Sequence, residues 1–86
     1  MRVRFTAHAE RKFAILRRHG VSVSKRHVIR TVEEPDWVDY SRMPLLIAQR
    51  GLDRRRVLRV VYRVEGEMNV IITFYPGRKS QYEKKK

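Results

Sequence analysis

The spacing of hydrophobic and polar residues divides the chain into a helical first part and a strand-rich second part. Residues Met1–Phe5 alternate between apolar and basic side chains, which predicts a short strand at a sheet edge. Apolar residues recur at helical spacing over Ala7–His19 and over Lys25–Glu33, which predicts two amphipathic helices. Thr6 is suited to cap the first helix, and Gly20 stands where a glycine stop is expected.

The second helix and the strands after it have their own boundary signals. Ser22 or Ser24 is suited to cap the second helix, and Pro35 ends it. Turns are expected at residues 51–55 and 65–67, and Pro76 with Gly77 is expected to break the last strand. The segments between these signals have the composition of strands: Trp37–Tyr40, Leu45–Arg50, Arg56–Val64 and Met68–Tyr75.

This order of elements predicts a single α+β domain over residues 1–86. A short N-terminal strand and two helices would accompany a three- to four-stranded antiparallel sheet, with both helices on one face. Residues 80–86 are expected to form a frayed basic tail.

Alternation within the last two strands separates a core side from a second side. The fully apolar sides are expected to face the helices, and they hold Leu58, Val60, Tyr62, Val70, Ile72 and Phe74. The other sides would place Arg59, Arg63, Thr73 and Tyr75 on a face without helices, with Arg78 and Lys79 on a turn beside Tyr75. Guanidinium groups beside a phenol suit a phosphodiester, although they are also ordinary exposed residues of a one-sided sheet.

The formal net charge is +12, from 21 basic and 9 acidic residues. The charge is uneven: residues 1–30 carry +8 and residues 50–64 carry +5, whereas residues 31–49 carry −3. A field this positive favours nucleic acid as the partner over a surface that is charged only for solubility.

Several classes of protein are not expected from this composition. The absence of cysteine excludes a disulfide framework and a thiol nucleophile, and it fits a cytoplasmic location. No apolar run approaches the roughly 20 residues that span a membrane. His8 and His19 would lie about 16 Å apart along one helix, too far to share a metal ion. We therefore expect neither a metal nor a cofactor.

His8 lies in the first turn of the predicted first helix, where the helix dipole favours a neutral imidazole that can act as a base. A surface histidine without a role is the alternative. If the chain cuts RNA, the 2′-hydroxyl would attack the adjacent phosphorus without a metal. His8 or Tyr75 would take its proton, and Arg59, Arg78 or Lys12 would stabilise the phosphate.

Short motifs throughout the chain resemble those of the RelE/ParE superfamily of toxins, with features of its BrnT branch. The motifs are Phe5-Thr6-x-His8-Ala9-x-x-Lys12, His19-Gly20-Val21-Ser22, Val57-Leu58-Arg59-Val60-Val61-Tyr62, Val70-Ile71-Ile72-Thr73-x-Tyr75-Pro76 and Arg78-Lys79-x-x-Tyr82-Glu83. The acidic segment at residues 33–39 departs from the BrnT pattern.

The resemblance implies a RelE-like fold, a metal-independent endoribonuclease and a cognate acidic antitoxin protein as partner. It implies catalytic roles for His8, Arg59, Tyr75 and Arg78. RNA, free or on the ribosome, would then contact Lys12, Arg50, Arg63, Thr73, Lys79 and Tyr82. Two alternatives remain from the same residues: a non-catalytic module that binds nucleic acid or the ribosome, and a ParE-like toxin that acts by binding protein.

Overall fold

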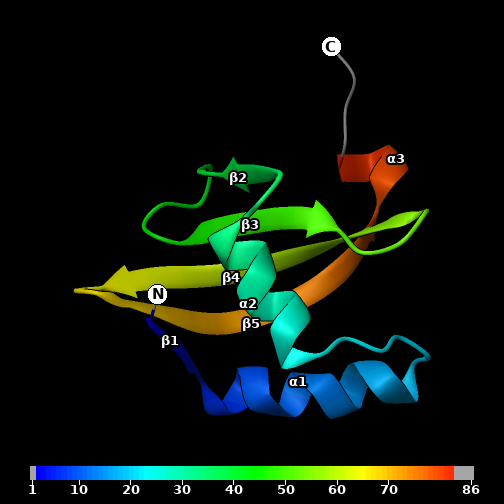
Figure 1. Cartoon of the computed structure of the whole chain (residues 1–86), viewed down its shortest axis with the longest axis horizontal. Helices are drawn as coiled ribbons and strands as arrows, with labels where there is room; N and C mark the ends of the chain where they lie inside the picture. The colour runs from blue at the N-terminus through cyan, green and yellow to red at the C-terminus, as the bar shows by residue number, and fades with distance from the viewer. Residues whose placement is uncertain (1, 83–86) are drawn as a thin grey trace.

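The computed structural model describes residues 2–82 as one five-stranded sheet with three helices (Figure 1). The elements follow the order β1 (Arg2–Phe5), α1 (Ala7–Arg18), α2 (Lys25–Glu33), β2 (Trp37–Asp39), β3 (Leu46–Gly51), β4 (Arg56–Glu65), β5 (Met68–Arg78) and α3 (Lys79–Tyr82). The strands lie in the order β1-β5-β4-β3-β2. The predicted α+β class is confirmed. The sheet is mixed rather than antiparallel, because β1 pairs in parallel with β5 at one edge.

The ends of α1 and α2 are set by the residue types expected from the sequence. The Thr6 hydroxyl accepts from the Ala9 amide at 3.1 Å and also donates to the Ile72 carbonyl at 3.2 Å, so it ties α1 to β5. Gly20, with φ +82°, ends α1 in the left-handed conformation that glycine tolerates best. Ser24, rather than Ser22, caps α2.

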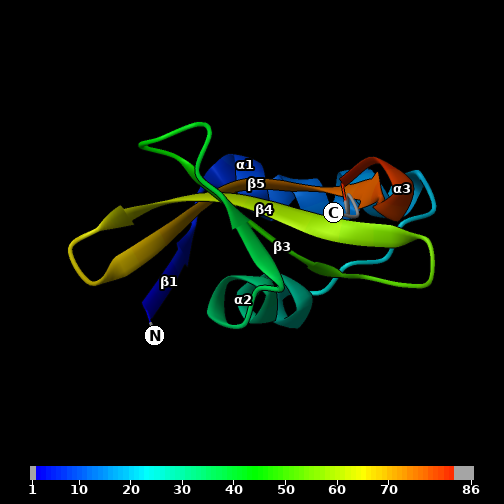
Figure 2. The ribbon, with the colours of Figure 1, turned by 90° about the horizontal axis from the view of Figure 1, so that it is seen from above.

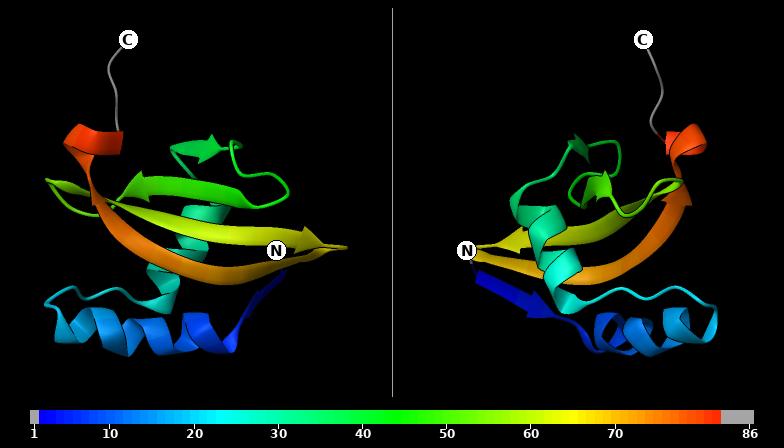
Figure 3. Two further views of the ribbon diagram at one scale, coloured as in Figure 1. Left: turned by 180° about the vertical axis from the view of Figure 1, so that it is seen from behind. Right: turned by 45° about the vertical axis from the view of Figure 1, so that its right-hand side comes forward.

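Both helices contribute to one hydrophobic core on one face of the sheet. α2 crosses β3 and β4, and α1 runs beneath β5 and β1 (Figure 1). The core contains side chains from both helices and from three strands: Ala9, Leu16, Val28, Val32, Ala48, Leu58, Val60, Tyr62, Ile71 and Phe74. Seen from behind, the opposite face of β3, β4 and β5 has α3 at one end (Figure 3, left).

A β-bulge corrects the predicted pattern of β5. The register passes from Val61 opposite Thr73 to Tyr62 opposite Ile71, so Ile72 is left without a partner. The side chains of β5 exchange faces at this point. Ile71 is therefore fully buried in the core. Val70 is fully buried as predicted, but it lies opposite Arg63 and so on the other side of the sheet from Ile71. Ile72 is only partly buried, and the prediction that it belongs to the core is wrong.

The end of the chain also differs from the expectation. Pro76 and Gly77 do not break the last strand, because β5 continues to Arg78. β1 ends opposite Ile71, so the later part of β5 has no β1 partner, and a proline is tolerated at such an edge. The expected turn at Arg78 and Lys79 is absent from the structure: Arg78 ends β5 and Lys79 begins α3. Residues 83–86 of the predicted tail lie outside the described residues.

α3 lies beside the ends of β4 and β5, away from α2 (Figure 2). It covers one end of the sheet face on which the sequence predicts no helix. No helix in residues 2–82 has the length and apolar character needed to cross a membrane.

Candidate functional site

The pairing of four strands brings polar residues into rows on the sheet face opposite the core. Gln49 lies opposite Arg59, which lies opposite Tyr75. In the next row, Asp39 belongs to β2 and Thr73 to β5. We call the surface formed by these five residues the Arg59 face. The predicted grouping of Arg59, Thr73 and Tyr75 on one face of the sheet is therefore confirmed.

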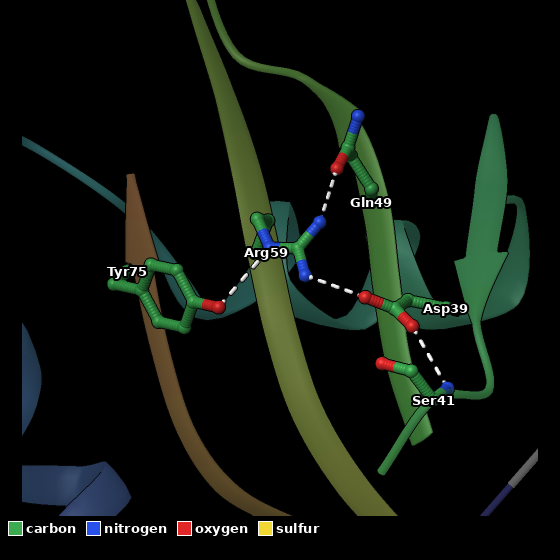
Figure 4. A network of polar contacts seen from close by, with 5 residues as sticks. All are labelled: Asp39, Ser41, Gln49, Arg59 and Tyr75. Carbon is green, nitrogen blue, oxygen red and sulfur yellow. Dashed lines mark hydrogen bonds and ion pairs between the residues drawn. The ribbon is translucent and has the colours of Figure 1, made fainter. Parts of the chain in front are cut away.

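Arg59 connects three other strands through its side chain (Figure 4). Its Nε donates to the Tyr75 hydroxyl at 3.1 Å, and its Nη1 donates to Gln49 Oε1 at 2.6 Å. Its Nη2 forms an ion pair with Asp39 Oδ2 at 3.0 Å. The guanidinium thus holds β2, β3 and β5 to β4.

The expectation that Arg59 lies uncovered on this face is wrong. Arg59 is only 4% exposed, and the centre of the Tyr82 ring in α3 lies 4.2 Å from its Cζ. This distance is within the range of a cation–π contact. Hydrogen-bond partners and the Tyr82 ring therefore cover the guanidinium group, and Arg59 is not an exposed cation on this face.

The pKa values of this network favour its charged form. Hydrogen bonds from the side chain and from the amide of Ser41 to the Asp39 carboxylate lower the pKa of Asp39 from 3.8 to about 2, and the bond from Arg59 adds to this effect. Burial by itself disfavours the charged guanidinium, but the bonds to Tyr75 and Asp39 outweigh it and raise the pKa of Arg59. The ion pair is therefore intact at neutral pH.

His8 reaches the Arg59 face from the first turn of α1. One ring nitrogen, Nε2, lies 3.1 Å from the Thr73 hydroxyl, although 65 residues separate the two in sequence. Thr73 and Tyr75 are two positions apart on β5, which places them roughly 7 Å apart on the same side. Lys12 follows His8 by one turn of α1. The structure thus brings His8 beside Thr73, two positions along β5 from Tyr75.

Arg78 and Lys79 lie in a second, strongly basic region at the end of β5. An open cleft there has a volume of about 1030 Å³ and is lined by Asp53, Arg54, Arg55, Arg56, Arg78, Lys79 and Ser80. We call Arg54, Arg55, Arg78 and Lys79 the basic corner. Among residues 2–82, none of the ion pairs involves these four side chains.

Asp53 gives the basic corner its shape. Its Oδ1 accepts from the amides of Arg55 and Arg56 at 2.9 and 2.8 Å, and its Oδ2 pairs with the Arg56 guanidinium at 2.8 Å. The bonds from the Arg56 side chain and the Arg55 amide lower the pKa of Asp53. Asp53 pairs with Arg56, whereas Arg54 and Arg55, which also line the cleft, have no ion-pair partner among residues 2–82.

Two of the predicted RNA-binding residues, Arg50 and Arg63, belong neither to the Arg59 face nor to the basic corner. Arg50 is opposite Leu58 in the register, so its side chain lies on the α2 side of the sheet, where it donates to the Glu34 carbonyl. Arg63 shares the side of Arg59 but lies toward the other end of β4, where it pairs with Glu65.

The sequence interpretation missed four residues that shape these sites: Asp39, Gln49, Arg54 and Arg55. Gln49 had a detectable signal, because it is a polar residue that continues the apolar run Leu45–Ala48. A buried polar side chain needs a partner, and Gln49 is 2% exposed beside Arg59. For Arg54 and Arg55 the sequence predicts only a turn.

Within residues 2–82, no three histidine, aspartate or glutamate side chains form a group that could hold a metal ion. Comparison of the chain with protein-family models, with curated proteins and with solved structures gave no match. The RelE-like fold and the toxin family therefore stay predictions from the sequence.

Proposed function

We propose that this chain is a toxin-type, metal-independent endoribonuclease, or mRNA interferase, acting in the cytoplasm. Its partners would be RNA, free or on the ribosome, and an acidic antitoxin protein. The observation that carries the proposal is the contact of His8 with Thr73, two positions from the Tyr75–Arg59 pair. This contact places an imidazole on the same strand and the same side as a phenol, in a protein of charge +12.

His8 and Tyr75 would divide the two proton transfers. The imidazole of His8 would take the proton of the 2′-hydroxyl as its oxygen attacks phosphorus. The bond from phosphorus to the 5′-oxygen would break, and the Tyr75 hydroxyl would protonate that oxygen. The products would be a 2′,3′-cyclic phosphate and a free 5′-hydroxyl.

Arg59 would act as a positioning residue for Tyr75. A guanidinium can only donate hydrogen bonds, so the Tyr75 oxygen accepts from Arg59 Nε and keeps its own proton for another acceptor. The same N–H would stabilise the negative charge that forms on the phenol oxygen after proton transfer. Arg78, with Lys79, would hold the neighbouring phosphates, since both line the basic corner.

A direct test is incubation of purified protein with RNA in EDTA, with and without ribosomes, followed by mapping of the product ends. We expect cleavage, with cyclic phosphate ends. His8→Ala and Tyr75→Phe should each lower the rate by at least about 100-fold. The matched controls are His19→Ala and Tyr40→Phe, at exposed positions outside the Arg59 face, and they should keep the wild-type rate. Intact RNA in every condition would refute the enzyme, and loss of cleavage in EDTA would refute the metal-free chemistry.

The burial of Arg59 favours a second candidate, a module that binds nucleic acid or the ribosome without cutting. With Arg59 only 4% exposed, the cationic group best placed beside Tyr75 would not itself contact a phosphate. This function would use the basic corner alone. Tight, salt-sensitive RNA binding with no product after prolonged incubation would establish it in place of the enzyme.

A further inference from the structure

A second basic pocket lies on the α2 side of the sheet, away from the Arg59 face. It has a volume of about 240 Å³ and lies between α2 and the end of β3. Three side chains of α2 and one of β3 provide its basic groups: Arg26, His27, Arg30 and Arg50. We call this pocket, together with the four basic residues that line it, the α2 pocket.

The capping of α2 fixes the hydrogen-bonding state of His27. The Ser24 amide donates to His27 Nδ1 at 3.2 Å, so Nδ1 is an acceptor. In the neutral ring, the proton then lies on Nε2, which is a donor. The α2 pocket therefore combines one imidazole N–H with three guanidinium groups, a set that suits a phosphate group.

The charges of the α2 pocket are weakly compensated. Glu34 pairs with Arg30 at 3.3 Å, but the two side chains are 61% and 59% exposed, so solvent screens most of this attraction. Arg50 is bonded to the carbonyl of Glu34 rather than to its carboxylate. The residues that line the pocket include no aspartate or glutamate.

The α2 pocket and the basic corner meet at the turn between β3 and β4. Gly51 and Leu52 line the α2 pocket, and the next residue, Asp53, lines the cleft of the basic corner. A Cβ placed on Gly51 would lie 3.9 Å from the Nζ of Lys79, so the ammonium group of the basic corner reaches the rim of the α2 pocket. A band of positive charge thus passes around the turn from one side of the sheet to the other.

We infer that this band binds one continuous single strand of RNA, with phosphates in the basic corner and in the α2 pocket. The inference rests on the proposed function for the identity of the polyanion. A duplex does not fit, because the domain measures only 34 × 34 × 19 Å and double-stranded DNA stays nearly straight over about 500 Å. A flexible single strand follows such a turn, and arginine-lined grooves track its backbone.

An acidic protein segment fits the band less well. A protein partner normally buries apolar side chains as well as charges. In the part of the chain that the structure describes, the exposed large hydrophobic residues are Trp37, Tyr40, Met43 and Val64, and none of them lines either pocket.

The test measures the salt dependence of binding to an oligonucleotide that the protein cannot cut. The probe is a labelled 20-nucleotide 2′-O-methyl RNA, which lacks the free 2′-hydroxyl, and the readout is fluorescence anisotropy over a series of KCl concentrations. The double variant Arg26→Ala/Arg30→Ala removes two charges of the α2 pocket. Arg54→Ala/Arg55→Ala removes two from the basic corner. Arg2→Ala/Arg11→Ala is the matched control, because these exposed arginines lie on β1 and α1, outside both pockets.

For single strands, the slope of log K against log salt changes by about 0.7 for each phosphate contact. We expect both pocket variants to lower the slope magnitude by about 1.4 and the control to leave it unchanged. Binding of a 20-base-pair duplex should not respond to Arg26→Ala/Arg30→Ala.

The possible outcomes separate this inference from the proposed function. A wild-type slope for Arg26→Ala/Arg30→Ala overturns the continuous path, even if the protein cuts RNA at the Arg59 face. The expected slopes in a protein that cuts no RNA support the path and refute the enzyme. Polyglutamate that competes as well as RNA of equal charge would overturn the assignment of the band to nucleic acid.

Discussion

Arg59 contacts more helices and strands than any other side chain of the Arg59 face. Its three bonds join β2, β3 and β5 to its own strand, and the Tyr82 ring adds α3. A buried ion pair is weak evidence of added stability, but removal of one partner leaves the other buried without compensation. Substitution of Arg59 would thus disturb the fold as well as any chemistry at Tyr75.

We expect Arg59→Ala to lower the free energy of unfolding by about 3 kcal/mol, because Asp39 and Gln49 lose their charged donor. Urea denaturation followed by circular dichroism measures the change. Arg63→Ala is the matched control: the Arg63 side chain is 41% exposed and pairs with the exposed Glu65, so its loss should cost below about 1 kcal/mol. Equal urea midpoints for the two variants would contradict the structural role of Arg59.

The lowered pKa of Asp39 predicts that the free energy of unfolding falls in acid. Its pKa is lowered from 3.8 to about 2 in the folded protein, so the ionised form contributes stability above pH 4. This contribution is lost as the pH falls through about 4 toward 2, and it is on the order of 2 kcal/mol. Asp39→Asn should therefore be less stable than the wild type at pH 7, and the difference should shrink between pH 4 and pH 2. Urea midpoints measured across this range test the prediction. A difference that stays constant with pH would show that the Asp39 carboxylate is not stabilised by folding.

Among the elements, helix ends and strand alternation could be predicted, but the register of β5 could not. Thr6 and Gly20 act locally, so the sequence around them is sufficient to place the ends of α1. The bulge depends on tertiary pairing. Val70, Ile71 and Ile72 are all apolar, and either alternation of faces fits the hydrophobic pattern. The sequence alone therefore has no means to select Ile71 for the core.

The arrangement of the candidate site is predictable only in part: alternation groups Arg59, Thr73 and Tyr75 on one side of the sheet, but it does not bring His8 to Thr73 or cover Arg59. His8, Thr73 and Tyr75 were each identified from their own segment, and their proximity comes from the packing of α1 against β5. The burial of Arg59 depends on Asp39 and on α3, and both are distant from it in sequence. Alternation shows which side of a strand a residue takes, but it does not show what covers that side.

Gly77 is the position at which β5 and α3 fit together, and it gives a prediction for this pair of elements. A Cβ at Gly77 would lie 2.3 and 2.5 Å from two carbons of the Tyr82 ring, which is closer than atoms can approach. Gly77→Ala should therefore displace the ring from Arg59. The NMR shift of the Arg59 Hε proton measures this, because an aromatic ring shifts nearby protons. Tyr82→Ala should move the signal in the same direction.

Gly51→Ala is the control for this experiment, since its Cβ would make only an ordinary contact with Lys79, at 3.9 Å. Its Arg59 Hε signal should match that of the wild type. An unchanged signal in Gly77→Ala would mean that Tyr82 does not cover Arg59 in solution.

At the scale of the whole molecule, repulsion among like charges opposes folding. The net charge of +12 is carried by 86 residues. Of the six ion pairs within residues 2–82, only Arg59–Asp39 is largely buried, and the other five join side chains that are 39% exposed or more. Exposed pairs contribute about 0–1 kcal/mol each, and salt screens them together with the repulsion. The balance of the two effects decides how the protein responds to salt.

We expect salt to stabilise this protein, because within residues 2–82 the positive charges outside any ion pair outnumber the exposed pairs. Raising NaCl from 10 mM to 500 mM shortens the screening length from about 30 Å to about 4 Å, so repulsion between the basic corner and the α2 pocket is largely removed. A gain of about 1 kcal/mol would raise the melting temperature by roughly 4–8 °C for a domain of this size. Differential scanning calorimetry measures this rise. Arg26→Gln/Arg54→Gln, which removes one charge from each pocket, should start from a higher melting temperature at low salt and gain less from NaCl. A melting temperature that falls with salt would mean that exposed ion pairs outweigh the repulsion.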